Sequence, residues 1–163
     1  MDFQAKVNMG IAQGWHGDFA SANPHVSVLG SDGMYPTGTG GVKVGSFVWV
    51  DETTYSTTPA LVNKGSGSPV GFVAREWNGV ITSWQAVVSN TIPQGVMVTA
   101  YAKGEFLVVL TEDVGAVKRG DEVYADPTTG ALSNAATKGA VTTHYTYTAS
   151  GNVGDVVSIS AWI

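Results

Sequence analysis

The sequence has no cysteine, few charged residues and no long hydrophobic run. The lack of cysteine excludes disulfides and thiolate metal sites, so rigidity has to come from packing or oligomerisation. The longest apolar run, residues 106–110, is far too short to span a bilayer, and residues 1–6 show neither a signal peptide nor a transit peptide. Because 44% of the 163 residues are hydrophobic, we expect a soluble globular protein with a sizeable core and no membrane partner.

Basic residues are also scarce. The chain has eight Lys plus Arg against thirteen Asp plus Glu, which gives a formal net charge of −5. Nucleic-acid binding requires clustered cations that displace counterions from phosphates. The sequence therefore predicts no nucleic-acid partner.

Motifs for catalysis and cofactors are missing. No Gly-x-Ser-x-Gly elbow, phosphate loop or dinucleotide fingerprint is present, and the three histidines lack metal-ligand spacing. Asp51 and Asp126 occupy equivalent ends of two similar segments, as a glycosidase carboxylate pair facing one another would, but turn capping is the stronger interpretation. Each precedes residues typical of a turn that its carboxylate caps. We expect no enzyme activity, no cofactor and no metal site.

Residues 1–25 differ from the rest of the chain. Apolar residues recur there at four-residue spacing, but three glycines interrupt the pattern, which favours an irregular arm over a stable helix. Isolated aromatic side chains need a surface to cover them, either on the same chain or on another one. The sequence leaves both alternatives open. It divides the chain into an arm, 1–25, and a β-rich domain, 26–163.

From residue 26 onward the pattern is that of β-structure, rich in Thr, Val and glycine turns. Residues 42–50 carry apolar side chains on both faces, which predicts a central strand. Residues 141–148 alternate and predict a ribbon with one solvated face. Lys103 and Gly104 are expected to form the turn of a hairpin.

Residues 42–51 and 117–126 match in register at valine, lysine, glycine, valine and aspartate. The match indicates either two related strand-turn units or a chance similarity between two such units. If the units are related, they favour a compact barrel-like or tulip-like all-β domain built from hairpins.

Five tryptophans and six tyrosines permit a further interpretation. Flat rings in an acidic β domain are able to stack on sugars, so a carbohydrate-binding domain is the main alternative to their use in a core or a subunit interface.

Several ordered runs give the chain a family resemblance that covers nearly its whole length. They are 17–24 (GDFASANP), 44–51 (VGSFVWVD), 71–76 (GFVARE), 92–95 (IPQG), 104–106 (GEF), 119–126 (RGDEVYAD) and 154–162 (GDVVSISAW). Because of these runs and their order, the chain resembles the structural cement family of tailed phages, which includes capsid decoration proteins.

The resemblance implies a β-rich, non-enzymatic protein that binds the outer surface of an assembled phage head and stabilises contacts between capsomers. Its implied partners are the major capsid protein and two further copies of itself in a homotrimer, and its implied location is the virion surface after synthesis in the bacterial host cytoplasm. An acidic chain suits that external position. We expect the contacts with the coat protein to come from the arm, through Phe3, Trp15, Asp18, Phe19, Asn23 and Pro24. A carbohydrate-binding domain on the virion surface is the alternative.

Overall fold

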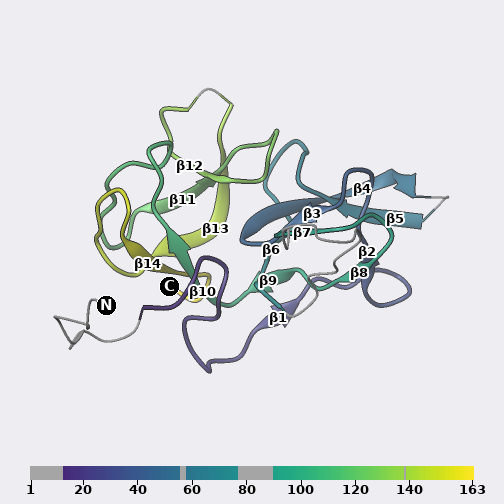
Figure 1. The fold of residues 1–163 in the computed structure, drawn as a ribbon, viewed down its shortest axis with the longest axis horizontal. Helices are drawn as coiled ribbons and strands as arrows, with labels where there is room; N and C mark the ends of the chain where they lie inside the picture. The colour runs from purple at the N-terminus through teal and green to yellow at the C-terminus, as the bar shows by residue number, and fades with distance from the viewer. Residues whose placement is uncertain (1–12, 56–57, 77–89, 138) are drawn as a thin grey trace, which may run out of the picture.

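The protein is an all-β structure. The computed structural model describes residues 13–55, 58–76, 90–137 and 139–163, and within these ranges it contains fourteen strands and no helix. The strands form two five-stranded sheets and two short strand pairs, with the sheets side by side in Figure 1. The predicted all-β class is therefore confirmed.

The first sheet comes from the N-terminal two thirds of the chain. Its order is β1 (Val26–Ser27), β9 (Tyr101–Lys103), β6 (Gly71–Val73), β4 (Ser46–Tyr55) and β5 (Thr58–Val62), and its neighbours are antiparallel. Two short pairs accompany it: β2 (Tyr35–Pro36) with β8 (Met97–Val98), and β3 (Val42–Lys43) with β7 (Thr91–Ile92). Strand β4 has neighbours on both sides, as the sequence predicted.

The second sheet comes entirely from the C-terminal part. Its order is β10 (Glu105–Val109), β14 (Val156–Ser160), β13 (Val141–Tyr147), β11 (Glu122–Ala125) and β12 (Leu132–Ser133), again antiparallel. In β13, Thr143, Tyr145 and Tyr147 are buried while Thr142 and His144 are exposed. The predicted ribbon with one solvated face is confirmed.

The larger hydrophobic core joins the two sheets through aromatic side chains. Phe47 and Phe72 of the first sheet meet Phe106 and Tyr145 of the second, with ring centroids 4.8 Å apart for Phe72–Phe106 and 5.7 Å apart for Phe47–Tyr145. All four side chains are essentially removed from solvent. Burial of this size supplies most of the free energy that holds one sheet against the other.

A second core lies on the opposite face of the first sheet. Val48 belongs to it, whereas its neighbours Phe47 and Trp49 belong to the aromatic core, so β4 buries both of its faces. Ile92 and Val98, from the short strand pairs, cover this second face. Because successive side chains of a strand point to opposite faces, the apolar sequence of β4 requires both layers.

The predicted barrel does not close. Strands β1 and β5 end the first sheet, and β10 and β12 end the second, without pairing to each other.

The hairpin predicted at Lys103 and Gly104 is wrong, because β9 pairs with β1 and β6 whereas β10 pairs with β14. The chain passes from one sheet to the other at Gly104, where an added Cβ would lie 2.8 Å from Phe106 Cζ. Close approach of the Phe106 ring therefore explains this glycine.

The repeated sequence unit is divided between the sheets. Its first copy contains the turn at Gly45 and strand β4, and its second copy contains the turn at Gly120 and strand β11. Both glycines have positive φ, 73° and 90°, which side chains disfavour. The common glycine thus reflects a common turn conformation.

Two neighbouring tyrosines on one face of β13 give a test of this core. The Tyr145 hydroxyl donates a hydrogen bond to the Tyr101 carbonyl (2.8 Å), so Tyr145→Phe leaves a buried carbonyl unpaired and is expected to lower the free energy of unfolding by about 1–3 kcal/mol. The equally buried Tyr147 hydroxyl has no hydrogen-bond partner among the described residues, so Tyr147→Phe is expected to change it by less than about 1 kcal/mol. Urea denaturation measures both, and equal losses would contradict the assignment.

Candidate functional site

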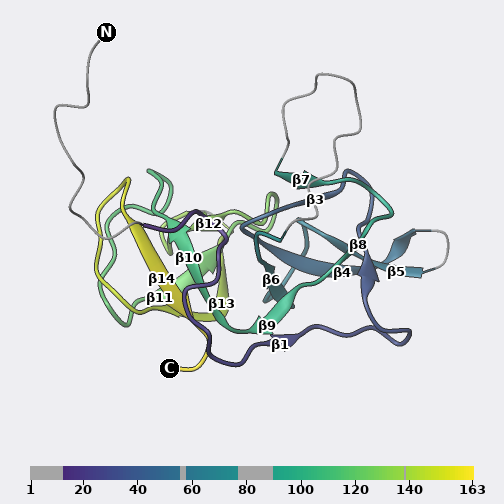
Figure 2. The ribbon, with the colours of Figure 1, turned by 60° about the horizontal axis from the view of Figure 1, so that its bottom comes forward.

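The described part of the arm pairs with the edge strand β10 of the second sheet through an isolated antiparallel β-bridge. Gly17 N–H donates to the Leu107 carbonyl (2.7 Å), Leu107 N–H donates to the Asp18 carbonyl (2.8 Å), and Ala20 N–H donates to the Glu105 carbonyl (2.9 Å). Phe19 lies opposite Phe106 in this pairing. Figure 2 shows the arm beside β10 before the chain enters β1. Residues 17–20 therefore fold back onto their own domain.

The carboxylate of Glu105 holds the next part of the arm. Its Oε2 accepts hydrogen bonds from the Ser21 hydroxyl and from Asn23 Nδ2, the latter at 2.8 Å, and its Oε1 accepts one from the Ser160 hydroxyl at 3.3 Å. These bonds, with Ser21 the strongest contributor, lower the pKa of Glu105 below its ordinary value. One side chain thus ties the arm to both β10 and β14.

His16 connects the arm to both sheets. Its Nε2 lies 2.7 Å from the Gly45 carbonyl, and Val109 N–H donates to Nδ1 at 3.1 Å. This pair of bonds requires a neutral ring protonated on Nε2. Burial is the main reason why the pKa of His16 is lowered, and nearby Lys43 lowers it further. A Cβ at position 45 would lie 2.3 Å from His16 Cδ2, so glycine is required there.

Trp15 lies near the start of the described arm and faces solvent, with 70% of its surface exposed. Asp18 closes the turn after it by accepting a hydrogen bond from Trp15 N–H on Oδ2 (2.9 Å). Arg75 N–H donates to the Gly17 carbonyl (2.7 Å), and the Arg75 guanidinium lies over the Trp15 ring, 5.6 Å from its centroid. The indole is therefore held in position while remaining accessible.

The structure gives different roles to the residues expected to contact a coat protein. Asp18 and Asn23 make the intramolecular hydrogen bonds described above, and Phe19, 37% exposed, packs against Phe106 with ring centroids 5.4 Å apart. Trp15 and Pro24 are exposed. Phe3 lies outside the described residues.

Sequence reasoning missed Glu105, His16 and Arg75. Two of them stand inside runs that carry the family resemblance, 104–106 and 71–76. In the folded chain these two runs contact the arm, which contains the 17–24 run. The ordered runs of the family resemblance were therefore the available signal for Glu105 and Arg75. His16 lies outside any such run and had no signal.

A second exposed tryptophan lies near the far end of the arm. Trp162 is 46% exposed, and the Lys103 ammonium lies 5.0 Å from its ring centroid. Lys103 pairs with Val26 of β1, and Ala161 N–H donates to the Gly104 carbonyl (3.1 Å). The C-terminal residues are thereby placed beside the passage between the sheets.

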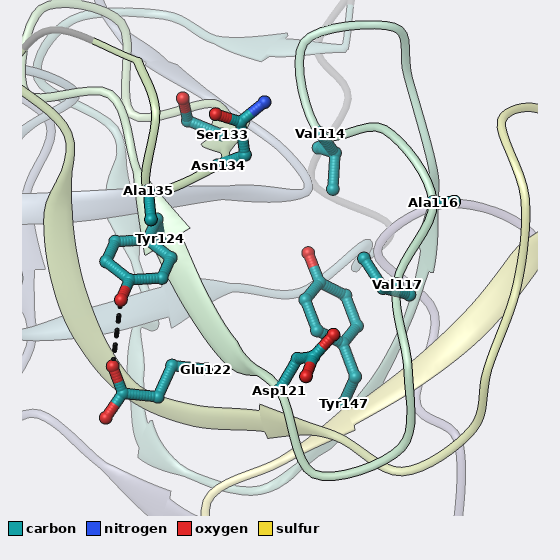
Figure 3. A pocket seen from close by; sticks show the side chains of 10 residues that line it. All are labelled: Val114, Ala116, Val117, Asp121, Glu122, Tyr124, Ser133, Asn134, Ala135 and Tyr147. Carbon is teal, nitrogen blue, oxygen red and sulfur yellow. Dashed lines mark hydrogen bonds between the residues drawn. The ribbon is translucent and has the colours of Figure 1, made fainter.

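A shallow depression of about 280 Å³ lies on the second sheet. Figure 3 shows the Tyr147 hydroxyl pointing into it, and the Tyr124 hydroxyl donating to Glu122 at 3.0 Å. Burial raises the pKa of Tyr147, with Asp121 contributing further. Its lining contains no histidine, cysteine or lysine.

The two candidate carboxylates occupy unlike positions. Asp126 caps a turn, as predicted: it accepts hydrogen bonds from the Thr128 hydroxyl (2.7 Å), from Thr128 N–H (2.8 Å) and from the Thr129 hydroxyl (3.0 Å), and these bonds lower its pKa. The same prediction for Asp51 is wrong, because Asp51 lies within β4 opposite Ala60. The strand continues to Tyr55 because β5 pairs with this part of it.

Two further features are absent from the described ranges. No set of three or more His, Cys, Asp or Glu residues is arranged to hold a metal ion. No helix with the length and hydrophobicity to cross a membrane is found there either.

The fold is similar to that of a chain in a solved phage capsid structure. A chain from a structure of the capsid of Myoviridae phage XM1 matches with a TM-score of 0.62 and 19% sequence identity, over 99% of this chain and 98% of that chain. At this identity the likeness shows the fold alone. No curated protein sequence matches this chain.

The sequence itself places the protein more narrowly. The family model of the XM1 gp53 minor capsid protein matches residues 3–161, so the chain belongs to that family. The predicted resemblance to capsid-associated proteins of tailed phages is confirmed, and with it a structural role in the phage capsid.

The Glu105 contacts predict how firmly the arm is attached. Glu105→Ala removes the acceptor shared by Ser21, Asn23 and Ser160, and is expected to lower the free energy of unfolding by about 1 kcal/mol and to speed proteolysis within 13–25. Denaturation and timed proteolysis measure both effects. Glu112→Ala, at an exposed position, is the control. An unchanged proteolysis rate would show that Glu105 does not hold the arm.

His16 predicts a pH dependence. Since its folded-state pKa lies below the ordinary value of 6.5, the unfolded chain binds the proton first, and stability is expected to fall as the pH drops below 6.5. His16→Gln should flatten this slope between about pH 7 and pH 5. His144→Gln, at an exposed site on β13, should leave it intact. Equal slopes in the wild type and His16→Gln would refute this role.

Proposed function

We propose that the protein is a capsid cement protein that binds the outer surface of an assembled phage head and stabilises contacts between neighbouring capsomers. The observation that carries the proposal is the anchored arm, in a chain whose family is that of a minor capsid protein. Three backbone hydrogen bonds to β10 and the Glu105 carboxylate fix the arm, and Trp15 projects from it into solvent. A rigid, exposed aromatic side chain is a typical centre of a protein interface.

The anchored arm suits binding to a preformed surface. A segment that is already ordered loses little conformational entropy when it binds, so even a small contact retains most of its binding free energy. In our proposal Trp15 and Pro24 contact the major capsid protein directly, together with Phe3 from the preceding segment. Asp18, Phe19 and Asn23 support this contact by holding the arm in place.

Oligomerisation strengthens such a contact. In a homotrimer each patch occurs three times, and after one has bound, the other two act at high effective concentration. Modest individual contacts then give firm retention on a shell of matching symmetry. Binding of several coat subunits by one trimer raises the free energy needed to separate them.

The charge of the chain supports the outer surface as its location. A net charge of −5 is repelled by DNA packed against the inside of a shell, whereas the outer surface imposes no such repulsion. We assign no catalytic role to the chain, because Asp126 is engaged in a turn and Asp51 lies within a strand.

Carbohydrate binding remains the second candidate, because two tryptophans are substantially exposed. However, a cation lies over each ring: Arg75 over Trp15 and Lys103 over Trp162. A stacked sugar would have to use the opposite face of the indole, so these rings suit a protein partner better.

Removing the Trp15 side chain tests the proposal. Wild-type protein mixed with undecorated capsids is expected to sediment with them and to give density between capsomers in particle images. Trp15→Ala should weaken binding at least about tenfold, equivalent to about 1.4 kcal/mol. Leu29→Ala is the matched control, because Leu29 is 69% exposed and lies in the connection before β2.

The outcomes separate the candidates. Absence of density on capsids would refute cement function, and equal binding by Trp15→Ala and Leu29→Ala would refute the role of the arm. Binding on a glycan array, lost in Trp15→Ala, would support the carbohydrate alternative.

A further inference from the structure

Both tryptophans that are accessible in the described part of the chain carry a cation on the ring. Trp15 is 70% exposed with the Arg75 guanidinium 5.6 Å from its centroid, and Trp162 is 46% exposed with the Lys103 ammonium 5.0 Å from its centroid. Trp49, by contrast, is buried and donates its ring N–H to the Gly67 carbonyl. The cation is thus a feature of the exposed rings.

Neither cation has an acidic partner within residues 13–55, 58–76, 90–137 and 139–163. No ion pair involves Arg75 or Lys103 there, and both side chains are exposed. The nearest carboxylate along the chain from Lys103 is Glu105, whose two oxygens are occupied by Ser21, Asn23 and Ser160. Each indole–cation pair therefore presents, beside an apolar ring, a positive charge that forms no ion pair with a described carboxylate.

Such a pair is suited to a particular chemistry. An arginine guanidinium binds a carboxylate through two parallel hydrogen bonds, and an adjacent indole covers the aliphatic part of an Asp or Glu side chain and its neighbours. Trp and Arg are also the residue types most enriched among energetically dominant interface positions. The complementary surface presents carboxylates next to apolar side chains.

The two pairs stand at opposite ends of the anchored arm. Arg75 is joined to the arm at Gly17 through its backbone N–H, and Lys103 pairs with Val26, where the arm enters β1. Between them, the arm is bound to β10 and held by Glu105. Their separation is consequently fixed, which makes them a rigid two-point contact.

We propose that Trp15–Arg75 and Trp162–Lys103 are two anchors for acidic side chains on the coat-protein surface that the cement function requires. This inference rests on the proposed function and specifies the chemistry of its partner. The net charge of −5 repels an acidic surface in general, so these two cations determine where that surface docks.

Charge removal at each anchor tests the inference. Arg75→Gln and Lys103→Gln are each expected to weaken binding to undecorated capsids about five- to tenfold in about 50 mM salt, and the double variant more strongly still. The loss should shrink in about 500 mM salt, because screening weakens the wild-type contact. Arg75→Lys should fall between wild type and Arg75→Gln, since it keeps the charge but not the planar fork.

Lys118→Gln is the matched control. It removes the same charge from an exposed residue in the turn before β11, and it should bind like the wild type. The Arg75 N–H that bonds Gly17 is a backbone group and survives Arg75→Gln. Unchanged thermal unfolding and unchanged proteolysis of the arm in all variants would exclude a purely structural effect.

The two proposals fail in different ways. If wild-type protein decorates capsids but Arg75→Gln and Lys103→Gln bind like Lys118→Gln, the acidic anchors are refuted and cement function stands. Tighter binding by Arg75→Glu would show that the partner surface is basic, and would also refute the anchors. If wild-type protein ignores capsids at every salt concentration, the cement function and the anchors are both refuted.

Discussion

Aromatic packing between two open sheets is the interaction on which the rest of the structure depends. Neither sheet closes on itself, so each has an apolar face that only the other can cover. Phe47, Phe72, Phe106 and Tyr145 form the contact, and large rings give much buried area for few residues. With no cysteine in the chain, no disulfide shares this task.

The arm is positioned by this junction. It pairs with β10, whose Phe106 is part of the aromatic core, and His16 bonds the Gly45 turn of the first sheet and the Val109 N–H of the second. A shift of one sheet against the other would therefore disturb the arm. The exposed tryptophans owe their fixed places to the same core that stabilises the fold.

Fold class could be predicted from the sequence because its signals are local. The alternation in 141–147 and the two-faced apolar pattern of β4 follow from strand geometry, and both are present in the structure. The choice of strand partners is not local. Lys103 and Gly104 fit a hairpin as well as a passage between sheets, and the choice depends on distant partners: β9 pairs with β1 and β6, and β10 pairs with β14. Closure of a barrel depends on the same long-range choice.

The candidate site was predictable only in part for a similar reason. Aromatic residues in a glycine-rich segment indicated that the arm needs a surface, but not which one. Glu105 looks like an ordinary solvated charge in sequence, because its three donors come from residues 21, 23 and 160. Arg75 and Lys103 gain meaning only from the rings beneath them.

Strand pairing between the arm and β10 also affects how free molecules behave toward one another. An uncovered edge strand offers unpaired N–H and C=O groups to any other chain and invites sheet-to-sheet polymerisation. Residues 17–20 pair with backbone groups of Glu105 and Leu107 on β10, and the turn at Trp15 and Asp18 ends this pairing after a few residues. The arm thereby protects this edge from indiscriminate self-association while the protein is not assembled on a shell.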